Sequence, residues 1–429
     1  MAVSSDYPNS WYVATSQPGE ALAPLVGEVN TDVCIIGGGY TGLSAAIHLR
    51  KLGYEVTLLE ANRAGWGASG RNGGHVGTGQ RAGQDELEKW MGLDQARALW
   101  QLGLDAVGLV ESLVDEFGIE CELGQGNLHL ASKRSHDQAL VDEIAHLQQR
   151  YGYSDVRYVA ADEIHQYTSA QGCYGGMLDS GARHLHPLRY ALGLRDAARA
   201  IGAKIYEYSP AQCYTESTNS VMVKTPSGSV RSRFLVLGCN GYLGKLEPRI
   251  AGNIMPINNF MIATAPLTEA LRASINPKNI SMSDSLFVID YWKFSADGRL
   301  LFGGGENYTS RFPKDIKSFV RPYMLKLYPE LAGTAIDYGW GGTLGITMNR
   351  MPDFGRLGRQ VFYAQGFSGH GVPTATMAGQ LMAQAIDGNA ERFDLMASVP
   401  TQRFPGGTLL RWPGLVAGML FYSLLDKLG

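Results

Sequence analysis

The chain has 429 residues, more than one hydrophobic core usually serves, so we expect two domains. Its hydrophobic fraction of 45% and charged fraction of 18% are ordinary for a soluble globular protein. The formal net charge is −3 and no block of Lys and Arg stands out, which argues against nucleic acid as a partner. The five cysteines show neither CxxC nor Cys/His spacing, which argues against a metal site or a disulfide framework and favours a reducing compartment.

The first thirty residues are polar and contain prolines, so we expect an irregular arm. No basic segment followed by an apolar core occurs between Met1 and Gly19, so no signal peptide is indicated. We therefore expect a cytoplasmic protein.

Order begins at Asp32 to Ile36, a short apolar run that leads into glycines and is typical of a buried parallel strand. Residues 41–52 have helical character and stop at Gly53, and residues 54–59 alternate like a second strand. Strand, helix and strand within about thirty residues make one βαβ unit.

The turn between that strand and helix carries the pattern G-x-G-x-x-G at residues 37–42. Gly37 permits the tight turn, Gly39 lets the backbone approach a pyrophosphate, and Gly42 allows close packing of helix on sheet. Glu60 ends the second strand, where a carboxylate can bind a ribose diol. A second signature is missing, because Gly303 to Gly305 follow a strand but precede no helical pattern. We therefore expect one dinucleotide cofactor and a substrate that itself supplies the electrons.

Further elements follow from periodicity and turn residues. They are a helix over 93–117 ended by Gly118, a helix from a capping box at Ser135 and Gln138 to Tyr151, a helix over 188–201, a strand within 229–239, several strands across 255–310 with a turn at Asp297-Gly298, and strand, Gly-rich loop and helix over 361–386.

The run from Asp32 through Gly65-Trp66-Gly67-Ala68-Ser69-Gly70-Arg71-Asn72-Gly73-Gly74 resembles the FAD-dependent amine and amino-acid oxidases of the D-amino acid oxidase/glycine oxidase superfamily, above all the gamma-glutamylputrescine oxidoreductase-like group. Further segments of the same pattern are 184–187, 297–304, 350–352, 365–371 and 404–407. The resemblance implies an α/β fold in which a Rossmann-type FAD-binding domain joins a discontinuous α+β substrate domain built on an antiparallel sheet. We expect the FAD-binding domain from 30–85, 150–250 and 340–395, the substrate domain from 90–150 and 255–340, and an apolar tail from 400–429.

A flavin ring also needs backbone donors where negative charge gathers on reduction, and Gly369 to Pro373 ahead of a helix has that form. The alternatives are a plain turn at Gly369 and a surface position for Arg71. The residues expected to hold FAD, several of them by resemblance alone, are Gly37, Gly39, Tyr40, Thr41, Gly42, Glu60, Ala61, Ala68, Ser69, Arg71, Asn72, Gly73, Gly74, Ala211, Gly341, Gly369, His370, Gly371 and Val372. Some relatives attach the flavin through a cysteine in the C-terminal half; none follows Cys239 here, so we expect non-covalent FAD.

The resemblance further implies oxidation of an amine C–N bond, with hydride passing to flavin N5 and hydrolysis of the imine product. Relatives that act on simple amino acids often place an arginine after Trp-x-Gly-Leu to clamp the carboxylate. Residues 340–345 lack that arginine, which favours a polyamine conjugate such as gamma-glutamylputrescine or a cyclic amino acid such as L-pipecolate. The alternatives are a sarcosine, glycine or D-amino acid-type oxidase and a flavin-binding protein without turnover. Oxygen or a quinone is expected to reoxidise the flavin.

Candidate catalytic and substrate-binding residues are His75, Tyr291, Lys293 and Arg350; no metal is expected. His75 is the best of them, because its loop should pass close to the flavin ring. Tyr291, with Trp292, is alternatively a core or rim aromatic, Lys293 a solvated lysine, and Arg350 a structural partner of an acid. His184 and His186 are expected to serve structure, by hydrogen bonds between the domains.

The C-terminal segment Pro413 to Leu425 is strongly apolar. Thirteen helical residues span roughly 20 Å, less than the ~30 Å hydrocarbon core, which argues against a transmembrane helix. The segment is expected to dock on the protein, to join subunits or to lie in a membrane interface. In the last case residues 411–428 contact the inner face of the membrane and electrons pass to quinone.

Overall fold

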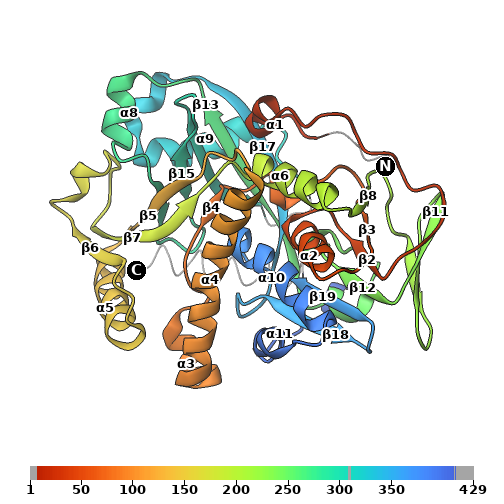
Figure 1. Ribbon diagram of the computed structural model, residues 1–429. Coiled ribbons are helices and arrows are strands. Elements are labelled where there is room, and N and C mark those ends of the chain that lie inside the picture. Colours follow the sequence, from red (N-terminus) through yellow and green to blue (C-terminus); the bar gives the residue numbers. More distant parts are fainter. Residues whose placement is uncertain (1–6, 308–310, 410, 412–429) are drawn as a thin grey trace.

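The computed structural model describes residues 7–307, 311–409 and 411. One layer is a six-stranded sheet in the order β18-β19-β12-β2-β3-β8, at the lower right of Figure 1. Its strands are β18 (Asp353–Leu357), β19 (Val361–Gln365), β12 (Phe234–Leu237), β2 (Val33–Ile36), β3 (Val56–Leu59) and β8 (Lys204–Tyr206). All neighbours are parallel except β18 and β19. Because both faces of the sheet are covered, β2 and β3 are buried along their whole length, as their continuous apolar runs predict.

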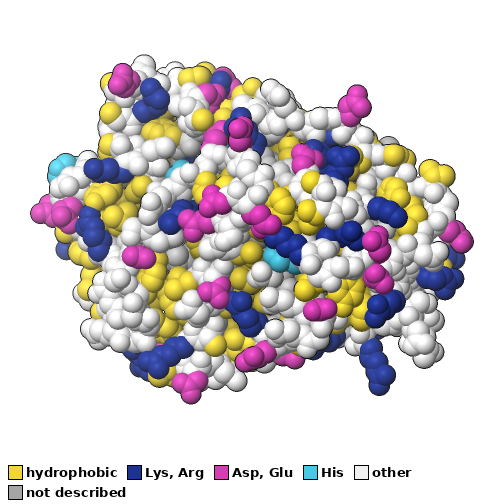
Figure 2. All heavy atoms as spheres, in the orientation of Figure 1, with side chains coloured by type: hydrophobic (Ala, Val, Ile, Leu, Met, Phe, Trp, Pro, Cys, Tyr) yellow, Lys and Arg dark blue, Asp and Glu magenta, His cyan; other side chains and the backbone are white. Residues whose placement is uncertain are grey.

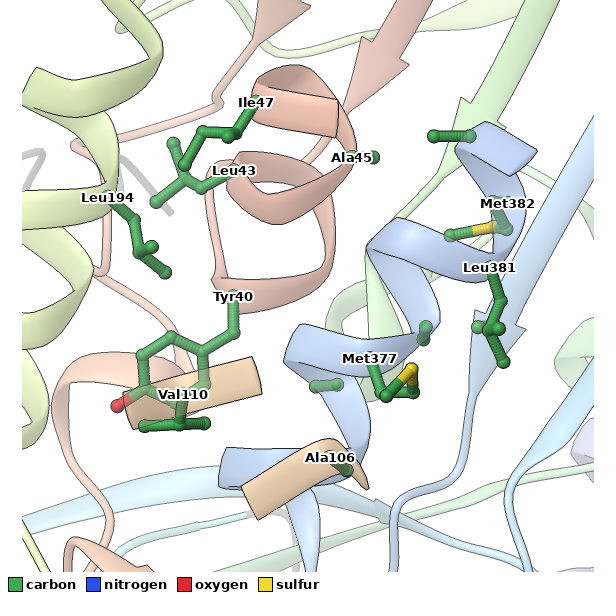
Figure 3. Close-up of a cluster of buried hydrophobic side chains, with 14 of the residues drawn as sticks. Tyr40, Leu43, Ala45, Ile47, Ala106, Val110, Leu194, Met377, Leu381 and Met382 are labelled. Carbon is green, nitrogen blue, oxygen red and sulfur yellow. The ribbon is translucent and has the colours of Figure 1, made fainter. Parts of the chain in front are cut away.

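Four helices pack around this sheet: α2 (Tyr40–Lys51), α4 (Leu93–Phe117), α6 (Pro187–Ala200) and α10 (Gly371–Ile386). Figure 3 shows the shared core, in which Leu43 and Ile47 of α2 lie beside Leu194 of α6, with Met377 and Leu381 on the neighbouring α10. The apolar stripes of these helices are fully buried there. This core fixes the N-termini of α2 and α10, the two helix ends that reach the cavity described below.

The second layer is a nine-stranded sheet, at the upper left of Figure 1. Its strands are β17 (Ile336–Ile346), β13 (Met255–Thr264), β16 (Leu300–Asn307), β15 (Tyr291–Phe294), β14 (Ser281–Asp284), β5 (Gly124–Leu130), β7 (Gly175–His184), β4 (His75–Val76) and β6 (Val156–Ala160), which pairs with β7. The pairs are antiparallel except β14 with β5, so the sheet is mixed rather than purely antiparallel. Helix α9 (Ile316–Leu327) covers one face through β13, β16 and β17.

Two expectations about local structure are wrong. The N-terminal arm contains helix α1 (Trp11–Ser16) and strand β1 (Gly27–Asn30), which pairs with β11 (Gly228–Ser232). Trp11 and Tyr12 are buried against α6 and the nine-stranded sheet, and such tertiary packing stabilises a helix too short to form alone. Helix α5 (Arg134–Tyr151) does form, but it begins after Lys133 without a side-chain cap, so the capping box is not made.

The long helix is confirmed at both ends, since α4 spans 93–117 and Gly118 adopts the left-handed conformation after it. The segment 150–250 divides differently from the expectation. Its strands β6 and β7 belong to the nine-stranded sheet, whereas β8 and β12 belong to the parallel one. A small third sheet, in the order β1-β11-β10-β9, contains the hairpin of β9 (Cys213–Glu216) and β10 (Val221–Lys224). On the face of the molecule drawn in Figure 2, Lys and Arg side chains are interspersed with Asp and Glu.

Candidate active site

A cavity of about 670 Å³ lies between the carboxyl ends of the parallel strands and one face of the nine-stranded sheet. Ile36 at the end of β2, Leu59 at the end of β3 and Gly238 after β12 border it on one side. Asn127 of β5 and Tyr291 of β15 border it on the other. The carboxyl edge of an open parallel sheet is where such folds bind nucleotides, and the volume is in the range of cofactor and ligand pockets.

The glycine turn before α2 closes one end of the cavity. Gly37 has φ +111°, which side chains rarely adopt, and a Cβ on Gly42 would lie 1.9 Å from the carbonyl oxygen of Gly37. Glycine is therefore required at both positions. The N–H of Tyr40 donates to Ser69 Oγ at 3.1 Å, and the other N–H groups of the first turn lack intrahelical acceptors. This helix end offers N–H donors and a positive dipole to phosphate oxygens.

Glu60 lies beside the same turn, directly after β3. Its Oε2 accepts a hydrogen bond from Gly38 N at 2.6 Å and its Oε1 accepts one from Asn62 N at 2.8 Å. Burial raises the pKa of Glu60, while these backbone hydrogen bonds lower it. The carboxylate is thus held at the rim of the cavity, near Ala61 and Ala211, where a ribose diol can donate to it.

The segment after Glu60 crosses from the parallel sheet to β4 and lines the middle of the cavity. Arg71 is 8% exposed, so it is not a surface arginine. Its guanidinium donates to Trp66 O at 2.7 Å and Gly341 O at 3.2 Å and stacks over the Trp66 ring. The loop is braced by Asn72, which donates to Ala68 O at 3.1 Å and accepts from the N–H of Gly74 at 2.7 Å.

A second helix end approaches from the carboxyl side of β19. Gly369, with φ +90°, His370, Gly371 and Val372 line the cavity as α10 begins. Burial lowers the pKa of the His370 imidazole to about 4, so it is neutral at pH 7. The cavity therefore has two helix N-termini, one at each Gly-rich turn.

Three residues of the cavity lining carry a buried polar atom without a partner. The atoms are Arg71 Nη2, His75 Nε2 and His370 Nε2. Buried polar groups in folded proteins are nearly always satisfied, so such a concentration in one lining is typical of a binding site. Two helix ends, a ribose-side carboxylate and unpartnered nitrogens in the lining fit FAD.

The comparisons with known proteins agree with this geometry. A family model described as FAD dependent oxidoreductase (DAO) matches residues 32–385. The chain belongs to the DAO family of FAD-dependent oxidoreductases. It is 38% identical over 426 residues to gamma-glutamylputrescine oxidoreductase of Escherichia coli (strain K12), covering 99% of this chain and 100% of that one. It is 37% identical to probable oxidoreductase OrdL of Rhizobium meliloti (strain 1021), covering 97% of each.

Among solved structures, glycine oxidase from Geobacillus kaustophilus shares the DAO fold with a TM-score of 0.72 at 20% identity, covering 87% of this chain and 99% of that one. The expectations of a Rossmann-type FAD-binding fold and of an FAD-dependent oxidoreductase are confirmed. Of the expected FAD contacts, Gly42, Gly74 and Gly341 are not among the cavity-lining residues of this DAO protein, although they shape the turn and the loop behind it. Every other expected contact residue lines the cavity.

His75 and Tyr291 meet on the wall formed by the nine-stranded sheet, their ring centroids 5.7 Å apart. The Tyr291 ring lies between two glycines: a Cβ on Gly73 would come within 2.6 Å of it and a Cβ on Gly303 within 2.1 Å. Its hydroxyl donates to Asn259 Oδ1. Burial lowers the pKa of His75 to about 3, so this imidazole is neutral at pH 7.

Lys293 is not among the cavity-lining residues. Lys293 is 2% exposed, so the alternative that it is a solvated surface lysine is wrong. Burial lowers its pKa to about 8, and the charge of Glu122 opposes that shift. Trp292 is a core residue, stacked on Phe302. Arg350 does line the cavity, and no acidic side chain in the described part of the chain forms an ion pair with it.

His184 and His186 both make structural hydrogen bonds. His184 Nε2 lies 3.0 Å from Asn279 O, and His186 Nε2 lies 3.1 Å from Thr15 Oγ1. The first bond stays within the layer of the nine-stranded sheet, whereas the second ties the N-terminal helix to the start of α6.

Sequence reasoning missed a group of polar residues on the sheet wall. The missed polar residues on strands are Asn127, His129, Asn259 and Ser283, and the missed lining residues between strands include Arg81 and Phe287. His129 Nδ1 lies 2.9 Å from Ser283 Oγ, and burial lowers the pKa of His129 to about 4. The available signal was weak: polar residues alternate with Leu128 and Leu130 on β5, and with Met282 on β14, at the period of two that places them on one face.

Proposed function

We propose that the protein oxidises the carbon–nitrogen bond of an amine that belongs to a polyamine conjugate, such as gamma-glutamylputrescine. The observation that carries this proposal is the position of the Tyr291 ring, which is held between two glycines and lies beside the neutral His75. Both side chains lie next to Gly73, in the segment that contains flavin-binding residues. Further support comes from the full-length similarity to the relative named gamma-glutamylputrescine oxidoreductase.

The residues of the chain would bind and orient the substrate, while FAD, when bound, supplies the acceptor for a hydride, which carries both electrons. The N-termini of α2 and α10 would hold the phosphates and the electron-rich edge of the flavin. His75 and Tyr291 would fix the amine carbon at the open face of the ring. Because His75 stays neutral at pH 7, it adds no positive charge that would oppose binding of a protonated amine. The amine would lose its proton after it has bound.

A glycine or D-amino acid type of activity is the weaker candidate. That activity calls for an arginine clamp on the carboxylate beside the amine. Strand β17 has glycine at 341, 342 and 345 and supplies no arginine. Arg71 lies next to this strand, but two backbone carbonyls already bind its guanidinium.

Anaerobic mixing of the holoenzyme with amines tests the proposal. Bleaching of the flavin absorbance is expected with gamma-glutamylputrescine, and slower or no bleaching with L-pipecolate, proline, sarcosine and D-amino acids. Preferred reduction by L-pipecolate would support the cyclic amino acid instead. An absorbance that no amine bleaches would identify a flavin-binding protein without turnover.

We further propose that the FAD is non-covalent. Cys239 is the only cysteine among the described cavity-lining residues, and it lies after β12, close to the Gly37 turn rather than to the second Gly-rich loop. Burial raises the pKa of its thiol to about 12, which keeps it protonated and weakly nucleophilic. Acid precipitation is expected to release yellow flavin into the supernatant; flavin that stays in the pellet would contradict this.

The electron acceptor is proposed to be oxygen or a quinone, with the protein in the cytoplasm or at the inner face of the membrane. The apolar tail on which the membrane contact depends, 412–429, lies outside the described residues, but Arg411 just before it donates to Ala251 O at 2.7 Å and Ile254 O at 2.9 Å. Among the described helices none is long and apolar enough to cross a membrane. Fractionation of cells that express the full chain or a 412–429 deletion tests the contact; equal distribution of both would contradict it.

A further inference from the structure

Charge is distributed unevenly around the cavity. Its ionisable lining residues are Glu60, the arginines Arg71, Arg81, Arg183 and Arg350, and the histidines His75, His129 and His370. Burial keeps the three histidines neutral at pH 7, because it lowers their pKa values to about 3, 4 and 4. Glu60 lies at the ribose end, so the described lining of the substrate half holds arginines and no carboxylate.

Three of the four arginines are engaged by the protein. Arg71 donates to Trp66 O and Gly341 O, and Arg183 forms an ion pair with Glu111 at 2.6 Å. Arg81 donates to Ser368 O at 3.1 Å, on the loop before α10. Arg350 differs, because its guanidinium makes neither a hydrogen bond nor an ion pair with any of the described residues and contacts the ring of Phe287, 5.2 Å away.

The backbone at Arg350 adopts the left-handed conformation, with φ +66°. This conformation is unfavourable for a long side chain, and strain of this kind persists where surrounding contacts impose it. Here the turn is fixed on both sides. Thr347 Oγ1 donates to Met351 O at 2.7 Å, and Asn349 accepts from Met351 N at 3.1 Å while donating to Pro400 O at 2.6 Å.

We propose that Arg350 binds a carboxylate of the substrate at the end remote from the oxidised amine, with Phe287 holding the guanidinium in place. The inference rests on the proposed amine oxidation and narrows its substrate class. A free diamine and a glutamyl conjugate both carry two ammonium groups, and the described substrate half holds no acid for them. Only the conjugate also presents a carboxylate, which matches an unpaired arginine. The enzyme therefore selects carboxylate-tailed amines over unmodified polyamines.

The test compares three amines that share one reacting end: gamma-glutamylputrescine, N-acetylputrescine, which keeps the amide but lacks the carboxylate, and putrescine. With R350M we expect KM for gamma-glutamylputrescine to rise about 10- to 100-fold, the loss typical of a charge-assisted hydrogen-bonded pair. The kcat/KM for N-acetylputrescine is expected to change less than about twofold, since it makes no such pair. R350K should lie between wild type and R350M. The matched control R233M removes an exposed arginine that pairs with Asp32 far from the cavity lining and is expected to behave as wild type.

A binding measurement separates this inference from the proposed function. The butylamide of glutamate, joined through its γ-carboxyl, keeps the α-amino acid end with its carboxylate but lacks the terminal amine of the putrescine part, the proposed site of oxidation. Titration of holoenzyme with this probe, followed by the flavin spectrum, should show binding that R350M weakens about 10-fold or more. Such binding in a protein whose flavin no amine reduces would disprove the proposed function and leave the carboxylate site standing.

A stability measurement distinguishes recognition from a structural role. Asparagine tolerates the left-handed conformation, so R350N is expected to unfold at the same temperature as wild type or at a higher one. The same variant is expected to bind the butylamide probe more weakly than wild type. The inference is overturned if R350M binds the probe as tightly as wild type, if wild type uses N-acetylputrescine as well as the conjugate, or if R350N unfolds at a lower temperature.

Discussion

The two sides of the cavity recognise ligands in different ways. On the parallel-sheet side, the lining includes the N-termini of two helices, with glycines where a Cβ would collide. On the nine-stranded sheet, the groups are side chains from several strands spread over the sequence, among them His75, His129, Asn259, Ser283 and Tyr291. Figure 1 shows these two layers, with α10 and β4 close to the junction between them.

The difference follows from what each side has to bind. A dinucleotide is large and constant, so a short glycine-rich segment that fixes backbone geometry suffices, and such a segment is local in sequence. A substrate is recognised by a few side chains whose spacing depends on strand register across the whole sheet. Strain and unsatisfied groups occur on both sides, at Arg350 and Asp290 Oδ1 on the substrate side and at Ser368 and His370 Nε2 beside the second Gly-rich loop.

The largest expected effect comes from G42A. The added Cβ would lie 1.9 Å from Gly37 O, so the turn and the start of α2 must separate, and the N–H groups that hold the phosphates move. We expect purified G42A to retain less than about a tenth of the FAD found in wild type, measured as the absorbance ratio of flavin to protein. Normal FAD content would contradict the inference that the glycine turn and the start of α2 hold the phosphates.

G108A is the matched control for that variant. Gly108 lies in the middle of α4, and a Cβ there meets no atom within 4 Å. Alanine in a helix interior is favoured over glycine by about 0.5–1 kcal/mol, so G108A is expected to keep full FAD and to gain slightly in stability. A loss of FAD in both variants would indicate general sensitivity to added methyl groups rather than a collision at the turn.

The same difference explains what the sequence could predict. The βαβ unit, the glycine turn, Glu60 and the helix ended by Gly118 depend on neighbours a few residues away, and the structure contains all of them. The N-terminal helix could not be predicted in this way, because Trp11 and Tyr12 are held by residues more than 170 positions later in the chain.

On the substrate side, residue types alone could not distinguish side chains that line the cavity from side chains that are packed in the core. Tyr291, Trp292 and Lys293 are adjacent on one strand, yet only Tyr291 is among the residues that line the described cavity. The alternation of a strand explains Trp292, which faces the other way. Alternation does not explain why Tyr291 lines the cavity and Lys293 does not, because both lie on the same face of the strand. The position of Lys293 depends instead on Glu122 and the buried layer under α1. His129 and Ser283 are joined only by the pairing of β5 with β14, which no local pattern indicated.

The second prediction moves to the substrate side. In G303A the Cβ would lie 2.1 Å from Tyr291 Cζ and displace the ring from its slot. We expect kcat to fall by about 100-fold, the scale seen when reacting groups are misplaced by about 1 Å, while FAD content stays near that of wild type. Steady-state rates combined with the flavin-to-protein ratio measure both effects. Loss of FAD together with activity would show that the two sides do not act separately.

The third prediction concerns the Asp290 carboxyl, which is 3% exposed. Burial, and secondly the charge of Asp284, raises its pKa to about 8. A raised pKa means that the folded state holds the proton more tightly, so this group lowers stability progressively as the pH rises from about 4 through 8. D290N is expected to be more stable than wild type by about 1–3 kcal/mol at pH 8, and the gain is expected to vanish near pH 4.

Thermal unfolding of both proteins at pH 5 and pH 8 checks this, with a rise in Tm of about 2–4 °C at the higher pH as the expected result. D115N, on the exposed end of α4, is the control without a buried carboxyl. If D290N unfolds below wild type at pH 8, the ionised Asp290 makes a favourable interaction and the account of strain on the substrate side is wrong.

The smallest expected effect comes from S283A, which removes the oxygen 2.9 Å from His129 Nδ1. One hydrogen bond contributes about 1 kcal/mol, so we expect a change of about fivefold in kcat/KM for the preferred amine and no change in FAD content. FAD content should not change, because Ser283 lines the cavity from the sheet and lies on none of the Gly-rich segments. A variant that binds less FAD would place His129 and Ser283 on the cofactor side. A rate equal to wild type would leave Tyr291 and His75 as the groups that position the amine and reduce His129 to a packed side chain of the wall.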